Sequence, residues 1–257
     1  MISFQNVSVV FGGLRAVDQT SFEIARGRIT GLIGPNGAGK TTAFNVIAGH
    51  IRPSSGKVIL DGSDITSLEP HQRAALGLAR TFQIAHEFSR LTVVENLMAA
   101  AASPFGENLL NVIFRRNKFQ PEEREHHTFA RETIKLLELD HVRNEKAGNL
   151  SGGQKKLVEL GRALMRKPKI ILLDEIGAGI NRTLLAKLAD KIKLLNQERG
   201  LTFCLIEHDL DYVSKLCDHV LVMAQGRLLT QGSVENVRCD ERVVEAYFGG
   251  GKYEAQR

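Results

Sequence analysis

The segment from Gly34 to Thr41 reads Gly-Pro-Asn-Gly-Ala-Gly-Lys-Thr, the spacing of a phosphate-binding loop. Glycines let backbone N–H groups turn inward around phosphate oxygens, and a helix after such a loop presents its positive N-terminus to them. Lys40 is expected to reach the β- and γ-phosphates of a nucleotide, and the Thr41 hydroxyl to bind Mg²⁺. The predicted nucleotide-binding residues are Gly34, Pro35, Asn36, Gly37, Ala38, Gly39, Lys40, Thr41 and Thr42.

An acidic pair follows a second apolar run. Ile170 to Leu173 reads as a buried strand, and Asp174 and Glu175 come directly after it. Because ligands bind outside the carboxyl ends of parallel strands, we expect Asp174 to hold the Mg²⁺ shell. Glu175 can polarise the attacking water as a general base. An apolar run ending in Asp-Glu can also be only a capped strand, but the phosphate-binding loop upstream favours the functional interpretation.

A second glycine-containing loop, Leu150-Ser-Gly-Gly-Gln154, precedes a helical pattern from Lys155 to Met165. A serine at a helix start with two exposed glycines makes a second phosphate cradle, although alone it is equally a simple N-cap. The sequence Leu-Ser-Gly-Gly-Gln between a phosphate-binding loop and an Asp-Glu strand resembles the signature of ABC ATPases. The resemblance implies that four residues of this loop contact nucleotide: Ser151, Gly152, Gly153 and Gln154.

The resemblance assigns three further positions. Gln83 falls where the family has a glutamine that ligates Mg²⁺ and senses the transmembrane partner. His208 matches the switch histidine that contacts the γ-phosphate, although without the other motifs it reads as an ordinary surface or core histidine. Phe11 matches the aromatic residue that stacks on adenine, and the alternative for it is a core position at a strand end. The implied cofactors are therefore ATP and Mg²⁺, with Glu175, His208 and Gln83 as the catalytic set.

Two positions depart from the family pattern. The family usually has proline after the catalytic glutamate, where this chain has Ile176, and aspartate in the next loop, where it has Asn181. Asparagine can hydrogen-bond across a subunit interface but cannot act as a carboxylate. Loss of the rigid proline is expected to loosen the loop that holds Glu175. Hydrolysis is expected, at a rate that these departures leave open.

Apolar periodicity predicts an α/β fold with a mostly parallel sheet and right-handed crossovers. The resemblance implies a P-loop NTPase (RecA-like) core, an antiparallel N-terminal β subdomain and an inserted helical subdomain. Expected strands are Ile2–Phe11, Ser21–Ile24, Ile29–Ile33, Val58–Leu60, Ile170–Leu173, Leu201–Ile206 and Val220–Met223, with helices over Lys40–Ala48 and Thr183–Glu198 and helical patterns from Ile84 to Met165.

The resemblance implies that these elements form one ABC ATPase domain over residues 1–250. Residues 1–83 and 168–250 would form the α/β core, residues 84–167 the helical subdomain with the signature loop, and residues 251–257 a C-terminal tail. A chain of 257 residues with 43% hydrophobic and 25% charged residues can bury one substantial core. The three cysteines show no metal-ligand spacing and no even pairing, so we expect reduced structural thiols.

The net charge of +5 does not point to nucleic acid, because aromatics do not interleave with the basic residues and no nucleic-acid motif is present. A solvated surface, able to face anionic lipid, is favoured. No apolar run is long enough to span a bilayer, and Met1 to Gln5 lacks the features of a signal peptide. We therefore expect the chain in the cytosol, bound peripherally at the cytoplasmic face of the inner membrane.

The loop containing Asn181 narrows the resemblance, which extends from Ile2 to Gly250. ATPase subunits of branched-chain or hydrophobic amino-acid importers usually have Ala-Gly-Leu-Asn here, and this chain has Ala-Gly-Ile-Asn. The segments Ala79–Gln83, Leu91–Asn96 and Arg242–Gly249 agree. The predicted function is the ATP-hydrolysing subunit of such an importer, or of a related amide or urea importer, working by ATP-dependent dimer closure.

The resemblance also implies partners: transmembrane permease subunits, a second ATPase subunit, identical or paralogous, in a head-to-tail dimer, and indirectly a solute-binding protein. Three alternatives stay open at this point. They are the ATPase of a lipopolysaccharide-type exporter, a non-transport ABC ATPase, and a nucleotide-binding partner with little catalysis. The sequence does not name the transported solute.

Overall fold

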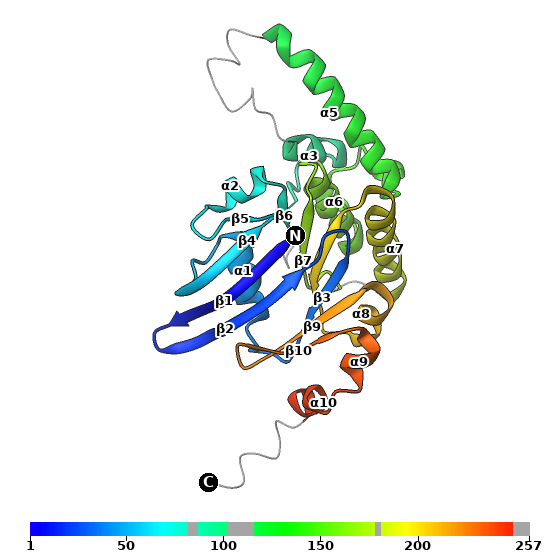
Figure 1. The fold of residues 1–257 in the computed structure, drawn as a ribbon. Coiled ribbons are helices and arrows are strands. Elements are labelled where there is room, and N and C mark those ends of the chain that lie inside the picture. The colour runs from blue at the N-terminus through cyan, green and yellow to red at the C-terminus, as the bar shows by residue number, and fades with distance from the viewer. Residues whose placement is uncertain (82–86, 102–115, 178–180, 249–257) are drawn as a thin grey trace. The chain divides into compact units, whose positions relative to one another are not determined.

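The computed structural model describes residues 1–81, 87–101, 116–177 and 181–248 (Figure 1). It divides into two compact units: unit 1 is Met1–Arg80, Lys169–Ile176 and Ile192–Arg257, and unit 2 is Thr81–Pro168 and Gly177–Lys191. The sequence-based division placed residues 177–191 in the α/β core, whereas in the structure they group with unit 2. One reason is the ion pair from Lys191 Nζ to Glu138 Oε1 at 2.7 Å.

Unit 1 contains an antiparallel sheet at the N-terminus, as the sequence resemblance implied. Its strand order is β2-β1-β4-β5. Ile2 of β1 pairs with Ile24 of β2 on one side and with Leu60 of β4 on the other. The strands are β1 Ile2–Phe11, β2 Leu14–Ile24, β4 Ser55–Leu60 and β5 Ser63–Asp64.

The second sheet of unit 1 has the order β10-β9-β3-β8-β7-β6, and among its described strands only the β10–β9 pair is antiparallel. Strands β3, β7 and β8 are buried along their whole length, which is why they read as continuous apolar runs. The strands are β3 Ile29–Ile33, β6 Leu78–Arg80, β7 Ile170–Asp174, β8 Thr202–Ile206, β9 His219–Ala224 and β10 Arg227–Gly232.

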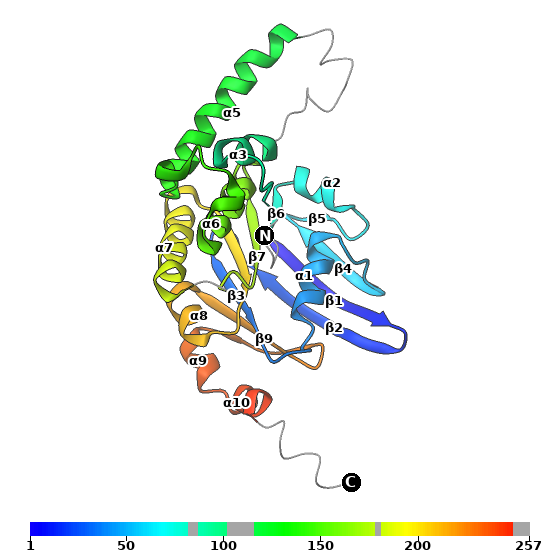
Figure 2. The same cartoon turned by 180° about the vertical axis from the view of Figure 1, so that it is seen from behind.

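Helix α1, Lys40–Ala48, shares one hydrophobic core with both sheets. Along β9 the side chains alternate: Leu221 and Met223 enter this core, while Val220 and Val222 enter a second cluster with α8, α9 and α10. The parallel sheet is therefore covered on both faces (Figure 2). The remaining helices of unit 1 are α2 Pro70–Ala75, α8 Leu210–Leu216, α9 Val234–Arg238 and α10 Glu241–Phe248.

Unit 2 is helical, as expected. Helix α6 contacts both α3 and α5. The buried side chain of Asn96 on α3 accepts a hydrogen bond from Phe88 N and donates one to the Leu91 carbonyl, which holds the segment before α3 against that helix. Among the described helices, none is both long and apolar enough to cross a bilayer. The helices are α3 Val93–Ala100, α5 Arg116–Leu136, α6 Gly152–Leu164, α7 Arg182–Arg199, whose second half belongs to unit 1, and 3₁₀ turns Asp140–Val142 and Ala147–Asn149.

Candidate nucleotide site

The carboxyl ends of three parallel strands bring the predicted residues of unit 1 to one edge of the sheet. Ile206 at the end of β8 is in register with Leu32 of β3 on one side and with Asp174 of β7 on the other. The phosphate-binding loop follows β3, Glu175 follows β7, and His208 follows β8. Strand register therefore explains why residues so distant in sequence meet here.

The phosphate-binding loop depends on backbone conformations that favour glycine. Gly34 and Gly39 have φ angles of 146° and 96°. A Cβ at Gly34 would lie 2.1 Å from the Met223 carbonyl oxygen, and one at Gly39 would lie 2.4 Å from the Ala16 carbonyl oxygen. The loop thus passes against other backbone at two points where no side chain fits.

Lys40 begins α1 and is only 5% exposed. Its Nζ donates to the carbonyl oxygens of Gly34 at 2.7 Å and Pro35 at 2.9 Å, so the side chain folds back along the loop. Burial lowers the pKa of Lys40, while the negative charges of Glu175 and Asp174 act in the opposite direction. A buried ammonium inside a ring of backbone groups fits an anionic phosphate ligand.

The loop lines a pocket of about 450 Å³, within the size range of small-molecule sites. Phe11, 48% exposed, lines this pocket, and its adenine-stacking role stays a prediction. Three lining residues were not predicted: Leu14, Arg15 and Ala16, which carry no motif of their own. The pocket is lined by Phe11, Leu14, Arg15, Ala16, Asn36, Gly37, Ala38, Gly39, Lys40, Thr41, Thr42, Glu175 and His208.

Glu175 and His208 are in direct contact. His208 Nε2 lies 2.7 Å from Glu175 Oε1, and both residues line the same pocket as Lys40. Glu175 has a φ of 47°, a left-handed conformation that is uncommon for a residue with a side chain. Its backbone N–H donates to the Ile206 carbonyl at 3.1 Å, which holds this conformation at the end of β7. Such strained positions cluster at functional sites.

Asp174 forms an ion pair that the sequence analysis did not predict. Arg80 Nη2 donates to Asp174 Oδ2 at 2.7 Å, and the two side chains are 9% and 7% exposed. Arg80 Nη1 also donates to Asn45 Oδ1 at 2.6 Å. Arg80 lies three residues before Gln83, in a segment where only Gln83 was singled out, and Gln83 itself is outside the described residues.

The oxygens available near the loop suit Mg²⁺. Carboxylate, hydroxyl and phosphate oxygens are its usual ligands, and it keeps few protein ligands when it binds with a nucleotide. Thr41, which carries a hydroxyl, lines the pocket, whereas Asp174, 5% exposed, is not among the lining residues, and its carboxylate lies near enough to Lys40 to act on the ammonium charge. Within the described part of the chain no group of three or more His, Cys, Asp or Glu residues could hold a metal by itself. A donor set of one hydroxyl and one carboxylate fits a metal that takes its other ligands from phosphate and water.

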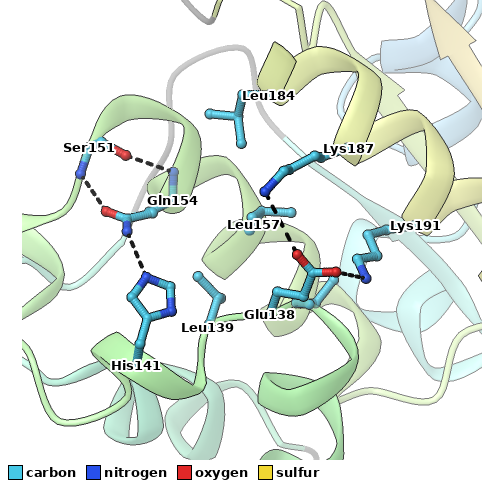
Figure 3. Close-up of a pocket in the computed structure, with 10 residues that line it drawn as sticks. Glu138, Leu139, His141, Ser151, Gln154, Leu157, Leu184, Lys187 and Lys191 are labelled. Carbon is cyan, nitrogen blue, oxygen red and sulfur yellow. Dashed lines mark hydrogen bonds and ion pairs between the residues drawn. The ribbon is translucent and has the colours of Figure 1, made fainter.

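The signature loop belongs to unit 2 and is built differently (Figure 3). Ser151 is the N-cap of α6: its Oγ accepts from Gln154 N at 3.3 Å, and Gln154 Oε1 accepts from Ser151 N at 2.9 Å. Gln154 Nε2 lies 3.4 Å from Nε2 of His141, which the sequence analysis did not single out. The capping box thus confirms the N-cap interpretation of Ser151. Gly152 at the helix start is exposed, but Gly153 is buried, so the expectation of two exposed glycines is wrong for Gly153.

Gly153 faces Leu184 of α7 so closely that a Cβ would lie 1.4 Å from Leu184 Cδ2. Leu184 is itself held at the start of α7, because Asn181 Oδ1 accepts from its backbone N at 2.9 Å. Asn181 is thus a helix cap within its own chain. A cavity of about 230 Å³ lies beside these residues, lined by Leu137, Glu138, Leu139, His141, Ser151, Gln154, Leu157, Leu184, Lys187 and Lys191.

The other departure from the family pattern, Ile176, has a buried side chain. It occupies the last position of the β7 segment of unit 1, directly after Glu175. The buried Ile176 side chain holds the turn at Glu175 by apolar packing, where a proline would hold it by its rigid ring. Residues 178–180 of the following loop lie outside the described residues.

Comparison with known proteins gives a consistent set of similarities. Residues 17–178 match the model of a family described as ABC transporter. A protein of Archaeoglobus fulgidus named "Probable branched-chain amino acid transport ATP-binding protein LivG" is 39% identical over 249 residues, which cover 97% of this chain and 95% of the relative.

Two solved structures are similar along most of the chain. A nucleotide-free ATP-binding cassette from an ABC transporter superposes with a TM-score of 0.84 at 39% identity, covering 97% of this chain and 99% of its own. A dimeric ATP-binding cassette bound to ADP and Pi, in a post-hydrolysis state, gives a TM-score of 0.72 at 25% identity, covering 91% of this chain and 99% of its own.

Proposed function

This chain belongs to the ABC transporter family, and on that premise we propose that it drives the import of branched-chain or other hydrophobic amino acids. It is an ATP-binding ATPase subunit. The single observation that carries the proposal is the meeting of Lys40, Glu175 and His208 in one pocket. The named relative supports the choice of solute, because its similarity extends over nearly the whole of both chains.

The pocket suggests how ATP is held. Backbone N–H groups of the phosphate-binding loop and the N-terminus of α1 face the phosphates, and Lys40 turns from the Gly34 and Pro35 carbonyls toward them. The exposed ring of Phe11 stacks on the adenine. When bound by Thr41 and Asp174, and by Gln83 in the adjoining segment, Mg²⁺ supplies neutralisation of phosphate charge.

Hydrolysis then depends on the Glu175–His208 pair. The Glu175 carboxylate accepts a proton from the attacking water, and the bond to His208 fixes the direction of that carboxylate. Nε2 carries a single N–H, so His208 would orient the Glu175 carboxylate before ATP binds and donate to the γ-phosphate afterwards. The left-handed backbone at Glu175 holds the carboxylate close to the phosphate loop.

The exposed signature loop is proposed to act on a second subunit. The N-terminus of α6 would form an anion-binding surface suited to the phosphates held by the partner's phosphate-binding loop, with Ser151 and Gly152 exposed, Gln154 half-buried and Gly153 buried in this subunit. ATP thus joins two subunits, identical or paralogous, head to tail, and a dimeric cassette among the similar structures supports this arrangement. Closure of the dimer would move permease subunits at the cytoplasmic face of the membrane, with a solute-binding protein acting indirectly.

The test is transport. Cells with the gene disrupted should lose uptake of radiolabelled leucine, isoleucine and valine; the wild-type gene should restore it, and a Glu175→Gln gene should not. Affinity capture from detergent-solubilised membranes should recover two permeases and a second ATPase. Recovery of lipid-export components would assign the chain to a lipopolysaccharide-type exporter. Normal uptake by the disrupted cells would refute the proposal.

A further inference from the structure

We infer that Arg80 is a positioning residue for the metal-binding oxygens of the nucleotide site. The inference rests on the metal role of Asp174 in the proposed function. Arg80 is the last residue of β6, and Asp174 is the last residue of the neighbouring strand β7. Arg80 pairs with Leu172 of β7, two residues before Asp174. The guanidinium spans this offset to reach Oδ2 at 2.7 Å. Because one oxygen is fastened, the plane of the carboxylate and the direction of Oδ1 are set.

The second contact of the guanidinium explains why the effect extends to Thr41. Arg80 Nη1 holds Asn45 Oδ1 at 2.6 Å, and Asn45 lies on α1 four residues after Thr41. Residues four apart share one face of a helix. Arg80 therefore ties the carboxylate of Asp174 to the same helix face that carries the Thr41 hydroxyl, which fixes the separation of two proposed Mg²⁺ ligands.

A comparison with Arg73 separates this role from simple burial. Arg73, 1% exposed, is more deeply buried than Arg80, but its guanidinium donates to the backbone carbonyls of Val46 and Ile47. Those bonds close the C-terminal end of the helix. Arg80 instead joins two side chains at the nucleotide site, and its planar fork of donors is suited to hold both at once. Lysine, a point donor, cannot reproduce both bonds.

The experiment measures Mn²⁺ affinity by electron paramagnetic resonance on the full chain with a non-hydrolysable ATP analogue. Loss of an outer-shell partner of a metal ligand typically weakens metal binding about 10- to 100-fold. We expect a weakening of about 10-fold in Arg80→Ala and a smaller one in Arg80→Lys and Asn45→Ala. Asn45→Ala should add little in the Arg80→Ala background, because both changes cut the same connection.

Arg52→Ala is the matched control, since Arg52 forms an exposed ion pair with Glu69 in the same unit. It should leave Mn²⁺ affinity unchanged. Affinity for a fluorescent nucleotide in EDTA should be unchanged in every folded variant, which separates metal positioning from general damage. If Arg80→Ala does not fold, Arg80→Lys and Asn45→Ala decide the question by the same measurement.

The inference is overturned if Arg80→Ala binds Mn²⁺ as tightly as the wild type or more tightly. If Arg80→Ala is unfolded, the same result in both Arg80→Lys and Asn45→Ala overturns it. Asp174→Asn distinguishes this failure from failure of the proposed function. If Asp174→Asn weakens Mn²⁺ binding and the Arg80 and Asn45 variants do not, Arg80 has no positioning role and the proposed site stands. If Asp174→Asn also binds normally, the metal assignment of the proposed function is wrong.

Discussion

The two glycine-containing loops that we propose to contact phosphate are built by opposite structural means. The loop from Gly34 to Thr42 relies on left-handed backbone, close backbone approaches and a buried Lys40. The helix after it has no side-chain cap. The loop from Leu150 to Gln154 has a complete capping box and an exposed start.

The difference indicates which loop is complete by itself. The first loop folds around its own ammonium and lies in a pocket with Glu175 and His208. The second satisfies the Gln154 N–H through Ser151 and leaves Gly152 exposed, which suits the proposed contact with a partner subunit. The conformation of the first loop requires glycines without side chains, whereas that of the second is held by the side chains of Ser151 and Gln154. Substitutions should therefore affect the two loops in different ways.

The largest effect is expected for Gly34→Ala. The new Cβ would lie 2.1 Å from the Met223 carbonyl oxygen, so the free energy of unfolding should fall by about 3 kcal/mol or more, and nucleotide binding should be lost. Gly37→Ala is the control, because its φ is also positive, at 77°, but nothing lies within 4 Å of the Cβ. It should cost about 1–2 kcal/mol. Equal losses in denaturant unfolding would mean that close approach is not what requires Gly34.

Lys40→Met should weaken ATP binding about 10- to 150-fold, corresponding to the 1.5–3 kcal/mol of a hydrogen bond to a charged group. Burial lowers the pKa of Lys40, so the protonated side chain opposes folding. That penalty is full below the lowered pKa and disappears as pH rises toward the unfolded-state value. In thermal unfolding, Lys40→Met should therefore gain more stability over the wild type at pH 7 than at pH 9.5. A larger relative gain at pH 9.5 would contradict this.

Ser151→Ala and Ser233→Ala form a matched pair. Both serines are N-caps whose Oγ accepts at 3.3 Å from the third helical N–H, Ser151 on α6 and Ser233 on α9. Each substitution should lower stability by about 1 kcal/mol. Only Ser151→Ala should also reduce phosphate release, because only that loop is proposed to face the partner's ATP. The same loss of turnover in Ser233→Ala would attribute the effect to stability alone.

The smallest effect is expected for Asn181→Asp. An aspartate oxygen can accept the Leu184 N–H as the asparagine oxygen does, so stability should change by no more than about 0.5 kcal/mol. Asn181→Ala removes the acceptor and should cost about 1 kcal/mol. Thermal unfolding of both variants measures the difference. A loss in Asn181→Asp as large as that in Asn181→Ala would show that the cap is not what Asn181 contributes to stability.

Sequence reasoning predicted the elements that are buried on both faces. Strands β3, β7 and β8 read as unbroken apolar runs, and the glycine loop after β3 has a spacing with few alternatives. Strand β6 was missed because it has three residues and ends in Arg80, and β10 because its residues are partly exposed and mixed in polarity. Periodicity carries little information for such strands.

The interactions that sequence reasoning missed join residues without a shared local pattern. Arg80 and Asp174 are 94 positions apart, and nothing near Arg80 reveals that its guanidinium will be buried beside a carboxylate. The contact of His141 with Gln154 likewise depends on packing within unit 2. The grouping of residues 177–191 with unit 2 depends on where Glu138 meets Lys191, which the strand–helix alternation does not encode.

The most direct test of the hydrolytic site is steady-state phosphate release by Glu175→Gln, assayed with the permease partners and saturating ATP and Mg²⁺. Loss of a general base typically costs 10²- to 10⁴-fold, so kcat should fall at least about 100-fold while nucleotide affinity stays at the wild-type value. Turnover equal to that of the wild type would contradict the assignment of Glu175, and with it the account of the Glu175–His208 pair as the centre of hydrolysis.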